Sequence, residues 1–284
     1  MKKIASLALT AALAGSLAVP ALAAEAPVLI SAPVDGYTTQ ITLNGEAVDT
    51  AGIPAAAEGL LPMRLLAEAD HGSAYWDEEN NEGWFYFGDN RVVIKFADNS
   101  VTVNDVAVDV DAADVIAGVT YMSADVFEGW EGYTVAWGDP TAEGFQSVSI
   151  TTPNNDPAVK LAYEIQELCS MGFGMQADEQ TLTDAYGVPA GSFEQVTAFF
   201  PMITSPDTVI IGKLAEGADQ AAVEAALETY RQGQEDTFSW YLTQNLPKVQ
   251  DARLVVENGW LLFLIADNAD AGVEAFQAFV EAQG

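Results

Sequence analysis

Cysteine, histidine and basic residues are scarce in this sequence, whose 284 residues include one cysteine, one histidine and 10 lysines and arginines. A single cysteine forms no internal disulfide, so the fold depends on packing. Cys169 stands in the apolar stretch IQELCSMGF, a setting typical of a buried, unreactive thiol. Structural zinc sites draw mainly on Cys and His, and Cys169 and His71 lie 98 positions apart, so zinc is not expected.

Several catalytic motifs are also missing. Any arrangement of nucleophile, histidine and acid would have to use His71, and no Gly-x-Ser-x-Gly turn accompanies it. No glycine-rich loop is followed by Lys and then Ser or Thr, as phosphate binding in nucleotide enzymes requires. We therefore assign no catalytic residues and favour a protein without enzymatic activity. A pair of carboxylates for glycoside hydrolysis stays open as an alternative, because 42 acidic residues conceal any such pair.

Acidic residues dominate the charge. The 42 aspartates and glutamates outnumber the basic residues so far that the formal net charge is −32, and both halves of the chain share the excess. A field of this sign repels nucleic acid and anionic lipid surfaces, so nucleic acid is not an expected partner. The composition favours solubility in an extracellular fluid, and the alternative use of the charge is attraction of cations or basic polymers.

The N-terminus resembles a secretory signal peptide. Lys2 and Lys3 precede a short apolar run, and small residues at Ala21 and Ala23 provide a cleavage site. We assign residues 1–24 to this signal and expect a secreted, extracytoplasmic product. The apolar run is too short for a membrane span, so no membrane insertion is expected after cleavage.

Residues 25–152 are predicted to form a first domain built from two copies of one unit. The copies lie about 60 positions apart and match at Asn44 and Asn104, Val48 and Val108, Gly59 and Gly118, Met63 and Met122, and Trp76 and Trp137. Each copy begins with a tight strand pair and continues through a short helix to a strand that carries a tryptophan. This order predicts an antiparallel, β-rich tandem repeat with short helices.

A polar linker at 153–157 separates this region from a second domain at 158–284. Initial helices there are followed by the order β-β-α-β-β-α, in which Asn258 and Gly259 form the strongest hairpin signal. The order predicts a four-stranded antiparallel sheet covered by helices. The whole chain is therefore predicted to be an α+β protein of two domains.

A cluster of motif residues in the first copy carries a family resemblance. The residues are Gly59, Pro62, Arg64, Glu68, Gly72, Trp76 and Asp77. This run resembles the copper amine oxidase N-terminal domain-like module of secreted and surface proteins of Gram-positive bacteria. The second copy departs from the motif, because Ser123 stands where the first has Arg64. The catalytic domain of a copper amine oxidase needs three histidine ligands, so the resemblance implies a noncatalytic extracellular module and no copper.

The same motif makes local predictions. Pro62 suits the first turn of a helix, Arg64 and Glu68 share a helix face, and Gly72 is placed as the C-cap.

The second half carries a resemblance of its own. Residues from about 163 to 280 include AYGVP, FFPMITSPDTVIIGKL and the Arg231-x-x-Gln234 step. They resemble domain of unknown function family 4358, found in secreted and lipid-anchored clostridial-type proteins. The resemblance implies fold and location, and no activity.

Three residues are candidates for ligand binding. Trp84 and Tyr86 share one face of a strand whose other face holds Phe85 and Phe87. One face must be core, and the other either offers aromatic rings to a sugar or packs against the neighbouring repeat. Gln234 falls on the apolar stripe of a long helix, where its amide serves either a structural hydrogen bond or a ligand.

The only metal considered is calcium, which needs only oxygen ligands. Asp77, Glu79 and Asn81 offer oxygens at alternate positions of the loop DEENNEG. Gly83 comes one place late and no glutamate closes a twelve-residue loop, so any site here is expected to be weak. No other cofactor is expected.

Together these observations predict a secreted, noncatalytic protein that binds at or near the cell envelope. The partner is a cell-wall polymer or an extracellular protein. The alternatives are an extracellular glycan hydrolase that uses Asp and Glu, and a secreted regulator of a partner protein.

Overall fold

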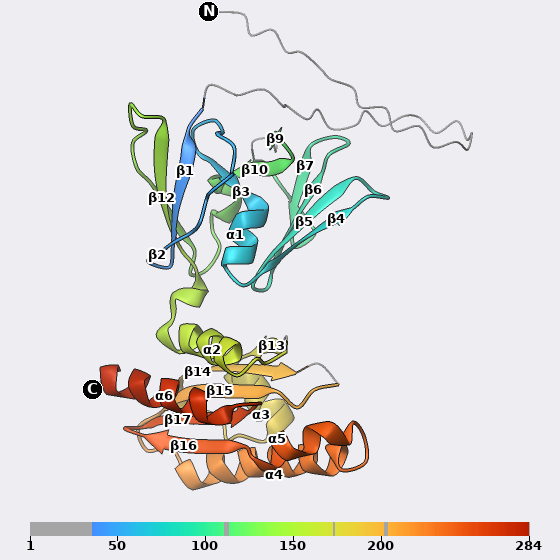
Figure 1. Ribbon diagram of the computed structural model, residues 1–284, viewed down its shortest axis with the longest axis vertical. Coiled ribbons are helices and arrows are strands. Elements are labelled where there is room, and N and C mark those ends of the chain that lie inside the picture. The colour runs from blue at the N-terminus through green and yellow to red at the C-terminus, as the bar shows by residue number, and fades with distance from the viewer. Residues whose placement is uncertain (1–35, 111–113, 173, 202–203, 284) are drawn as a thin grey trace, which may run out of the picture. The chain divides into compact units, whose positions relative to one another are not determined.

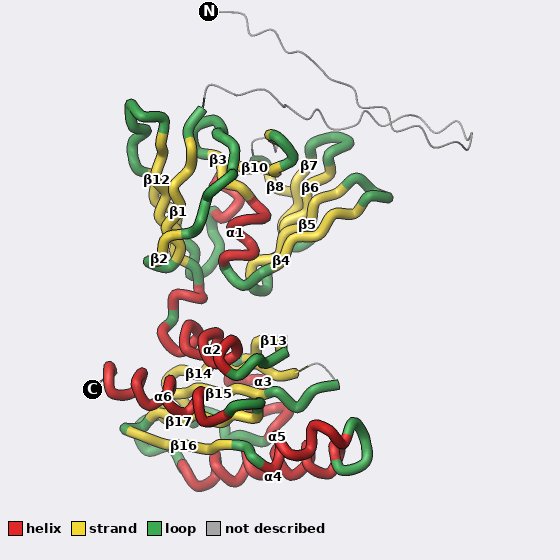
Figure 2. The backbone as a smooth tube through the Cα atoms, viewed as in Figure 1, coloured by secondary structure: helices red, strands yellow, loops and turns green. Residues whose placement is uncertain are grey.

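The computed structural model describes residues 36–110, 114–172, 174–201 and 204–283 (Figure 1). The predicted signal peptide at 1–24 lies outside these residues. The described chain divides into two compact units after Asn155, inside the predicted linker at 153–157. Helices and strands are mixed in an α+β arrangement, as predicted (Figure 2). No helix in the described part of the chain is both long enough and apolar enough to span a bilayer.

In its described residues, the first unit consists of strands with one α-helix and two 3₁₀ turns. Its elements are β1 (Thr38–Leu43), β2 (Glu46–Ala47), β3 (Leu60–Pro62), α1 (Met63–Ala69), β4 (Ser73–Asp77), β5 (Glu82–Phe87), β6 (Asn90–Lys95), β7 (Ser100–Val103), β8 (Val106–Val108), β9 (Asp114–Ile116), β10 (Val119–Ser123), η1 (Ala124–Phe127), β11 (Thr134–Trp137), β12 (Phe145–Thr151) and η2 (Pro153–Asn155). The helix expected in the second copy is only the 3₁₀ turn η1.

The two sequence copies interleave instead of folding separately. One sheet has the order β4-β5-β6-β7-β8 and another has the order β11-β12-β1-β2. Each sheet thus joins the first hairpin of one copy to the tryptophan-bearing strands of the other. Between the sheets, β3 of the first copy pairs with β10 of the second. Neither copy therefore forms a complete sheet from its own strands, and each sheet contains strands of both copies.

One pairing in this unit differs from the antiparallel expectation, because β1 runs parallel to β12. In the other sheet β5 and β7 also share a direction, with β6 between them. No described strand of the second copy corresponds to β6. Strands β12 and β1 correspond to β5 and β7 and likewise run in the same direction. Because no described strand lies between them, they pair directly and form a parallel pair.

Both predicted hairpin turns form as expected. Asn44 and Gly45 have φ of 52° and 87°, and Asn104 and Asp105 have φ of 50° and 67°. Asn, Asp and Gly adopt these left-handed values most readily, which is why they occupy such turns. The side-chain Oδ1 of Asn44 accepts a hydrogen bond from the amide of Thr152 (2.9 Å), and Oδ1 of Asn104 accepts one from the amide of Arg91 (2.8 Å). Each asparagine side chain therefore links its hairpin to the neighbouring strand, which is β12 for Asn44 and β6 for Asn104.

The second unit is one sheet between two layers of helices. Its elements are α2 (Pro157–Leu168), β13 (Gly174–Ala177), α3 (Glu179–Tyr186), β14 (Phe193–Pro201), β15 (Thr208–Leu214), α4 (Gln220–Phe238), η3 (Thr243–Asn245), α5 (Leu246–Gln250), β16 (Arg253–Glu257), β17 (Trp260–Ile265) and α6 (Ala269–Gln283). The sheet order is β13-β14-β15-β17-β16, and all its described pairs are antiparallel.

This sheet has five strands, one more than the predicted four. The additional strand, β13, has the sequence GMQA and lies at the edge, where it pairs with β14. Its first residue is a glycine and its two central side chains are exposed, so it lacks the alternating apolar pattern that identified the other strands. Edge pairing therefore determined a strand that local sequence did not indicate.

Helices cover both faces of the sheet (Figure 1). Residues of α2 and α6 pack on one face, and residues of α3, α4 and α5 pack on the other. Every residue of β17 is consequently buried, which explains its continuous apolar sequence WLLFLI. Cys169 is 1% exposed at the end of α2, and burial raises the pKa of its thiol. The prediction of a buried cysteine is confirmed.

Candidate binding site

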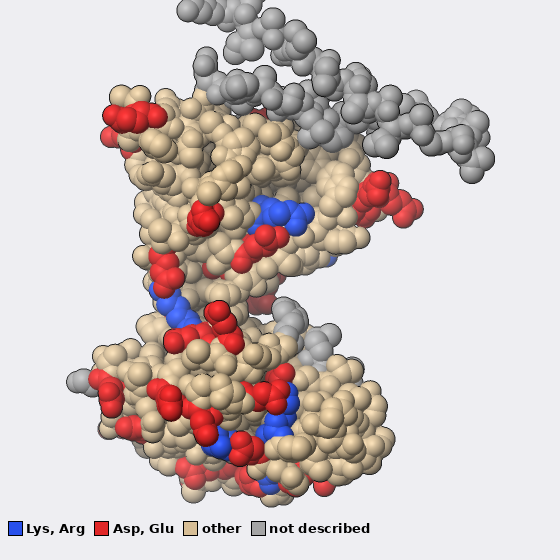
Figure 3. All heavy atoms as spheres, viewed as in Figure 1, with Lys and Arg blue, Asp and Glu red and all other residues tan. Residues whose placement is uncertain are grey.

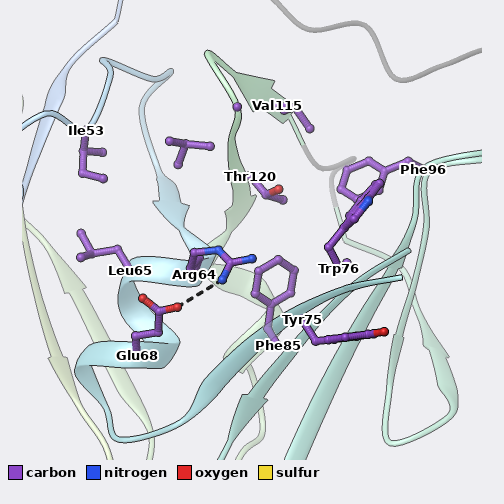
Figure 4. Close-up of a pocket in the computed structure, with 13 residues that line it drawn as sticks. Ile53, Arg64, Leu65, Glu68, Tyr75, Trp76, Phe85, Phe96, Val115 and Thr120 are labelled. Carbon is purple, nitrogen blue, oxygen red and sulfur yellow. Dashed lines mark hydrogen bonds and ion pairs between the residues drawn. The ribbon is translucent and has the colours of Figure 1, made fainter. Parts of the chain in front are cut away.

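A pocket of about 520 Å³ opens on the first unit between α1, the β4–β5 hairpin and the β9–β10 pair (Figure 4). It is lined by Ile53, Arg64, Leu65, Glu68, Tyr75, Trp76, Gly83, Phe85, Phe96, Val115, Gly118, Val119 and Thr120. A volume of this size accommodates a small ligand or several side chains of a partner. Its walls are mostly apolar, so it favours an apolar group.

Helix α1 supplies the charged wall. It begins after Pro62, which serves as its N-cap residue, and it buries Met63, Leu66 and Ala67 in the core. The opposite face turns Arg64 and Glu68 toward the pocket, where Nη1 of Arg64 lies 3.2 Å from Oε1 of Glu68, as the spacing predicted. Both side chains are about half exposed, so this ion pair contributes only a few tenths of a kcal/mol to stability.

The chain turns sharply between α1 and β4. His71, with φ of 60°, takes the left-handed position after the helix, so the prediction of Gly72 as the C-cap was wrong. Gly72 is needed for a different reason. A Cβ atom there would lie 1.9 Å from the carbonyl oxygen of Tyr86. The absence of a side chain lets the end of α1 approach β5.

Aromatic rings form the opposite wall and the floor. The centroids of Trp76 and Phe96 lie 5.5 Å apart, and Phe85 is buried beneath them. Trp76 is 43% exposed at the lip of the pocket, whereas the ring of Tyr75, which pairs with Trp84, lies on the opposite face of the hairpin. Gly83 keeps the floor open, since a Cβ atom there would lie 3.1 Å from Phe85 and 3.3 Å from Phe96.

A buried tyrosine holds the remaining wall. The hydroxyl of Tyr121 donates a hydrogen bond to the carbonyl of Pro54, next to Ile53 of the lining. Tyr121 is fully buried among the apolar side chains of this segment, and desolvation raises its pKa to about 12. The bond fixes the segment that carries Ile53 against β10.

Replacing Tyr121 with phenylalanine is expected to lower the free energy of unfolding by about 1 kcal/mol, the usual net worth of one such bond. The difference should depend on pH. The phenol ionises near 10.0 when unfolded and near 12 when folded, so the wild type loses stability as pH rises through this range. Urea denaturation of both proteins at pH 8 and pH 11 measures the effect. The prediction is contradicted if the wild type exceeds the phenylalanine variant in free energy of unfolding by as much at pH 11 as at pH 8.

A buried polar network lies behind α1. Oδ1 of Asp70 accepts hydrogen bonds from Oγ1 of Thr152 (2.7 Å), Nδ2 of Asn154 (3.2 Å) and Nδ2 of Asn44 (3.3 Å). Asp70 is 1% exposed, and its Oδ2 has no hydrogen-bond partner among the described residues. Desolvation therefore outweighs the three hydrogen bonds and raises the pKa of this carboxyl. The network joins the end of α1 to the end of β12.

Trp84 and Tyr86, predicted to bind ligand, lie on the face of β5 that is opposite to the pocket. Nε1 of Trp84 donates to Oε2 of Glu82 (3.0 Å), and the guanidinium of Arg91 lies 5.1 Å from its ring centroid. The half-buried Trp84 ring thus meets charged groups of its own sheet. The pocket uses Phe85 from the other face instead, a role that alternation along the strand alone did not reveal.

Gln234 lies in the second unit, on α4, and is partly exposed. Trp84 and Tyr86 belong to the first unit, and the pocket of that unit does not include Gln234.

The candidate calcium ligands occupy the tip of the β4–β5 hairpin. Oδ1 of Asp77 accepts the amides of Glu79 (3.0 Å) and Asn80 (3.1 Å), and its Oδ2 accepts Nδ2 of Asn80 (2.7 Å). The hydrogen bonds from Asn80 lower the pKa of Asp77. Asn81 takes a left-handed φ of 56° at the turn. The Asp77 carboxylate therefore makes hydrogen bonds within its own loop.

Within the described ranges, no group of three or more His, Cys, Asp or Glu is placed to hold a metal ion.

A smaller pocket of about 260 Å³ occupies the equivalent place in the second copy. It lies between η1 and β11 and is lined partly by Asp125, Glu128, Tyr133 and Trp137. The tryptophan of the repeat recurs here, but Ser123 replaces Arg64 and a 3₁₀ turn replaces α1. The two copies therefore present different surfaces.

Comparison with known families agrees with the sequence resemblances. Residues 42–143 match the family described as "Copper amine oxidase N-terminal domain". Residues 171–266 match the family described as "Domain of unknown function (DUF4358)". Neither the curated proteins nor the solved structures gave a match to this chain.

The whole pocket falls inside the segment that resembles the copper amine oxidase N-terminal domain, which we call the N-terminal-like domain. Arg64, Glu68 and Trp76 of the recognised motif line the pocket, and Gly72 permits the turn that brings α1 and β4 together. The motif residues are therefore grouped around one cavity.

Proposed function

We propose that this chain is a secreted, noncatalytic binding protein and that the pocket of the N-terminal-like domain receives its ligand. The signal-like N-terminus and the acidic composition support release outside the membrane. The ligand belongs to the cell envelope or is an extracellular protein.

An exposed tryptophan at the mouth of the pocket carries this proposal. Large apolar side chains usually lie inside a folded domain, yet Trp76 remains 43% exposed above an apolar cavity. Burying such rings against a ligand provides much of the binding free energy at interfaces.

The lining argues against glycoside hydrolysis at this place. Hydrolysis of a glycosidic bond uses two carboxyl groups on opposite sides of the bond. Among the described residues that line the pocket, Glu68 is the only carboxylate, and it is paired with Arg64.

Co-sedimentation of the mature protein with isolated cell walls tests the proposal. We expect Trp76→Ala to reduce the bound fraction about tenfold or more, because it removes a central exposed ring. Trp84→Ala is the matched control, since it removes a tryptophan from the opposite face of the same sheet. Parallel samples with and without calcium test the loop at Asp77.

Equal losses for the two tryptophan variants would show that the pocket is not the site. Wild-type protein that stays in the supernatant would rule out the cell wall as the partner, and soluble extracellular proteins would then be tested with the same two variants.

A further inference from the structure

We propose that the pocket binds a basic, extended polypeptide, which places one apolar side chain in the cavity and pairs its backbone with the outer edge of β4. This inference rests on the proposed function and specifies the chemical class of the ligand.

Strand β4 has an unpaired edge beside the pocket. Among the described strands it pairs only with β5. The carbonyl of Ala74 accepts a hydrogen bond from Nη1 of Arg64 (3.3 Å), so this carbonyl points away from β5. Backbone groups of alternate residues in an antiparallel strand point to the same side, so the amide and carbonyl of Trp76 also face outward. The backbone amide and carbonyl of Trp76 would therefore be the hydrogen-bond partners of an incoming strand.

The position of Arg64 indicates how such a strand docks. Its guanidinium donates to Ala74, as a backbone amide of an added strand would. The Arg64 side chain is 54% exposed, and its ion-pair partner Glu68 is equally exposed. Moving it aside therefore costs little.

The cavity itself favours an apolar side chain over a sugar. Sugar hydroxyls that leave water need hydrogen-bond partners, because burying an unpaired polar group is unfavourable. The polar side chains of the described lining are Arg64, Glu68, Tyr75, Thr120 and the indole of Trp76, and the first two already bond each other. Isoleucine, leucine, valine and phenylalanine provide most of the remaining surface.

Charge selects a basic ligand. Glu78 and Glu79 are exposed at the hairpin tip that follows β4. Figure 3 shows acidic side chains at this tip, and the chain as a whole carries −32. Arg64, the basic residue of the lining, is neutralised by Glu68. An anionic lipid or phosphate polymer would be repelled, whereas lysines that flank an apolar residue would be attracted.

The test uses the mature full-length protein and a short fluorescent peptide of alternating lysine and threonine with one central leucine. Fluorescence anisotropy measures its affinity. We expect about a tenfold loss or more when the leucine is replaced with serine, and a similar loss when the lysines are replaced with glutamate. N-methylation of alternate backbone amides on the pairing edge should also abolish binding, because it removes the strand hydrogen bonds.

Two protein variants complete the experiment. Trp76→Ala should weaken binding about tenfold or more, and Trp84→Ala should leave it unchanged. Affinity that is indifferent to the leucine or to N-methylation would overturn the proposal. So would Trp76-dependent binding of a neutral oligosaccharide or of lipid vesicles in place of the peptide.

The same variants separate this inference from the proposed function. If Trp76→Ala abolishes cell-wall binding while no peptide binds, the pocket is a binding site and its ligand is not a polypeptide. If the peptides bind as expected and cell walls do not, the polypeptide ligand stands and the cell wall is not the partner.

Discussion

Replacing Gly72 with alanine is expected to lower the free energy of unfolding of the N-terminal-like domain by about 3 kcal/mol or more. The new methyl group would lie 1.9 Å from the carbonyl oxygen of Tyr86, and 3.0 Å from that of Ala67. Both are backbone atoms, so no side-chain rotation relieves the overlap. Either α1 or the β4–β5 hairpin must move, and both form walls of the pocket. Urea denaturation followed by circular dichroism measures the loss.

Gly233 provides the control. It lies within α4, where a Cβ atom would meet nothing within 4 Å. Alanine is the better helix former, so Gly233→Ala is expected to raise stability by about 0.5–1 kcal/mol. The Gly72 variant should also bind the leucine peptide less well, because its pocket walls are displaced. A Gly72→Ala protein as stable as the wild type would show that the close approach of α1 and β5 is not required.

Replacing Asp70 with alanine is expected to destabilise the same domain by about 2–3 kcal/mol. Thr152, Asn154 and Asn44 each lose a hydrogen bond to the carboxylate, and the hydroxyl of Thr152 is buried. Thr152 and Asn154 lie 82 and 84 positions from Asp70 in the sequence. A local rearrangement around Asp70 therefore does not replace the carboxylate. Thermal unfolding monitored by circular dichroism measures the change, and a loss under about 0.5 kcal/mol would contradict it.

Asp70→Asn separates the hydrogen bonds from the charge. The amide oxygen still accepts the three bonds, but the side chain no longer ionises. Because burial raises the pKa of Asp70 in the folded state, the wild type is most stabilised by this group below pH 3.8 and loses that stability as pH rises through the folded pKa. The stability of Asp70→Asn relative to the wild type should therefore increase over this range and then level off. A constant difference would mean that the pKa is not raised.

Local sequence was sufficient for elements defined by neighbouring residues. The Asn44–Gly45 and Asn104–Asp105 turns, the Arg64–Glu68 pair and the burial of Cys169 all follow from residue types within a few positions. The mixed α+β organisation also followed, because apolar periodicity distinguishes helices from strands.

The candidate site was only partly predictable. Motif residues Arg64, Glu68 and Trp76 were recognised, but their common cavity was not, because Phe85, Phe96 and Val119 come from other strands. Alternation placed Trp84 and Phe85 on opposite faces of β5 without indicating which face meets α1. The packing of α1 against the Phe85 face depends on two glycines. Gly72 lets the end of α1 approach β5, and Gly83 leaves room for the rings of Phe85 and Phe96.

The sequence by itself determined the two α+β halves, their family resemblances, the acidic charge and the turns, because each depends on composition or on contacts between near neighbours. Only the tertiary structure decided that the two copies exchange hairpins, that β1 runs parallel to β12, that β13 joins the second sheet, and where the pocket opens. These features depend on which distant segments pair, and the free energy of such pairing comes from surfaces that are brought together only when the whole domain folds.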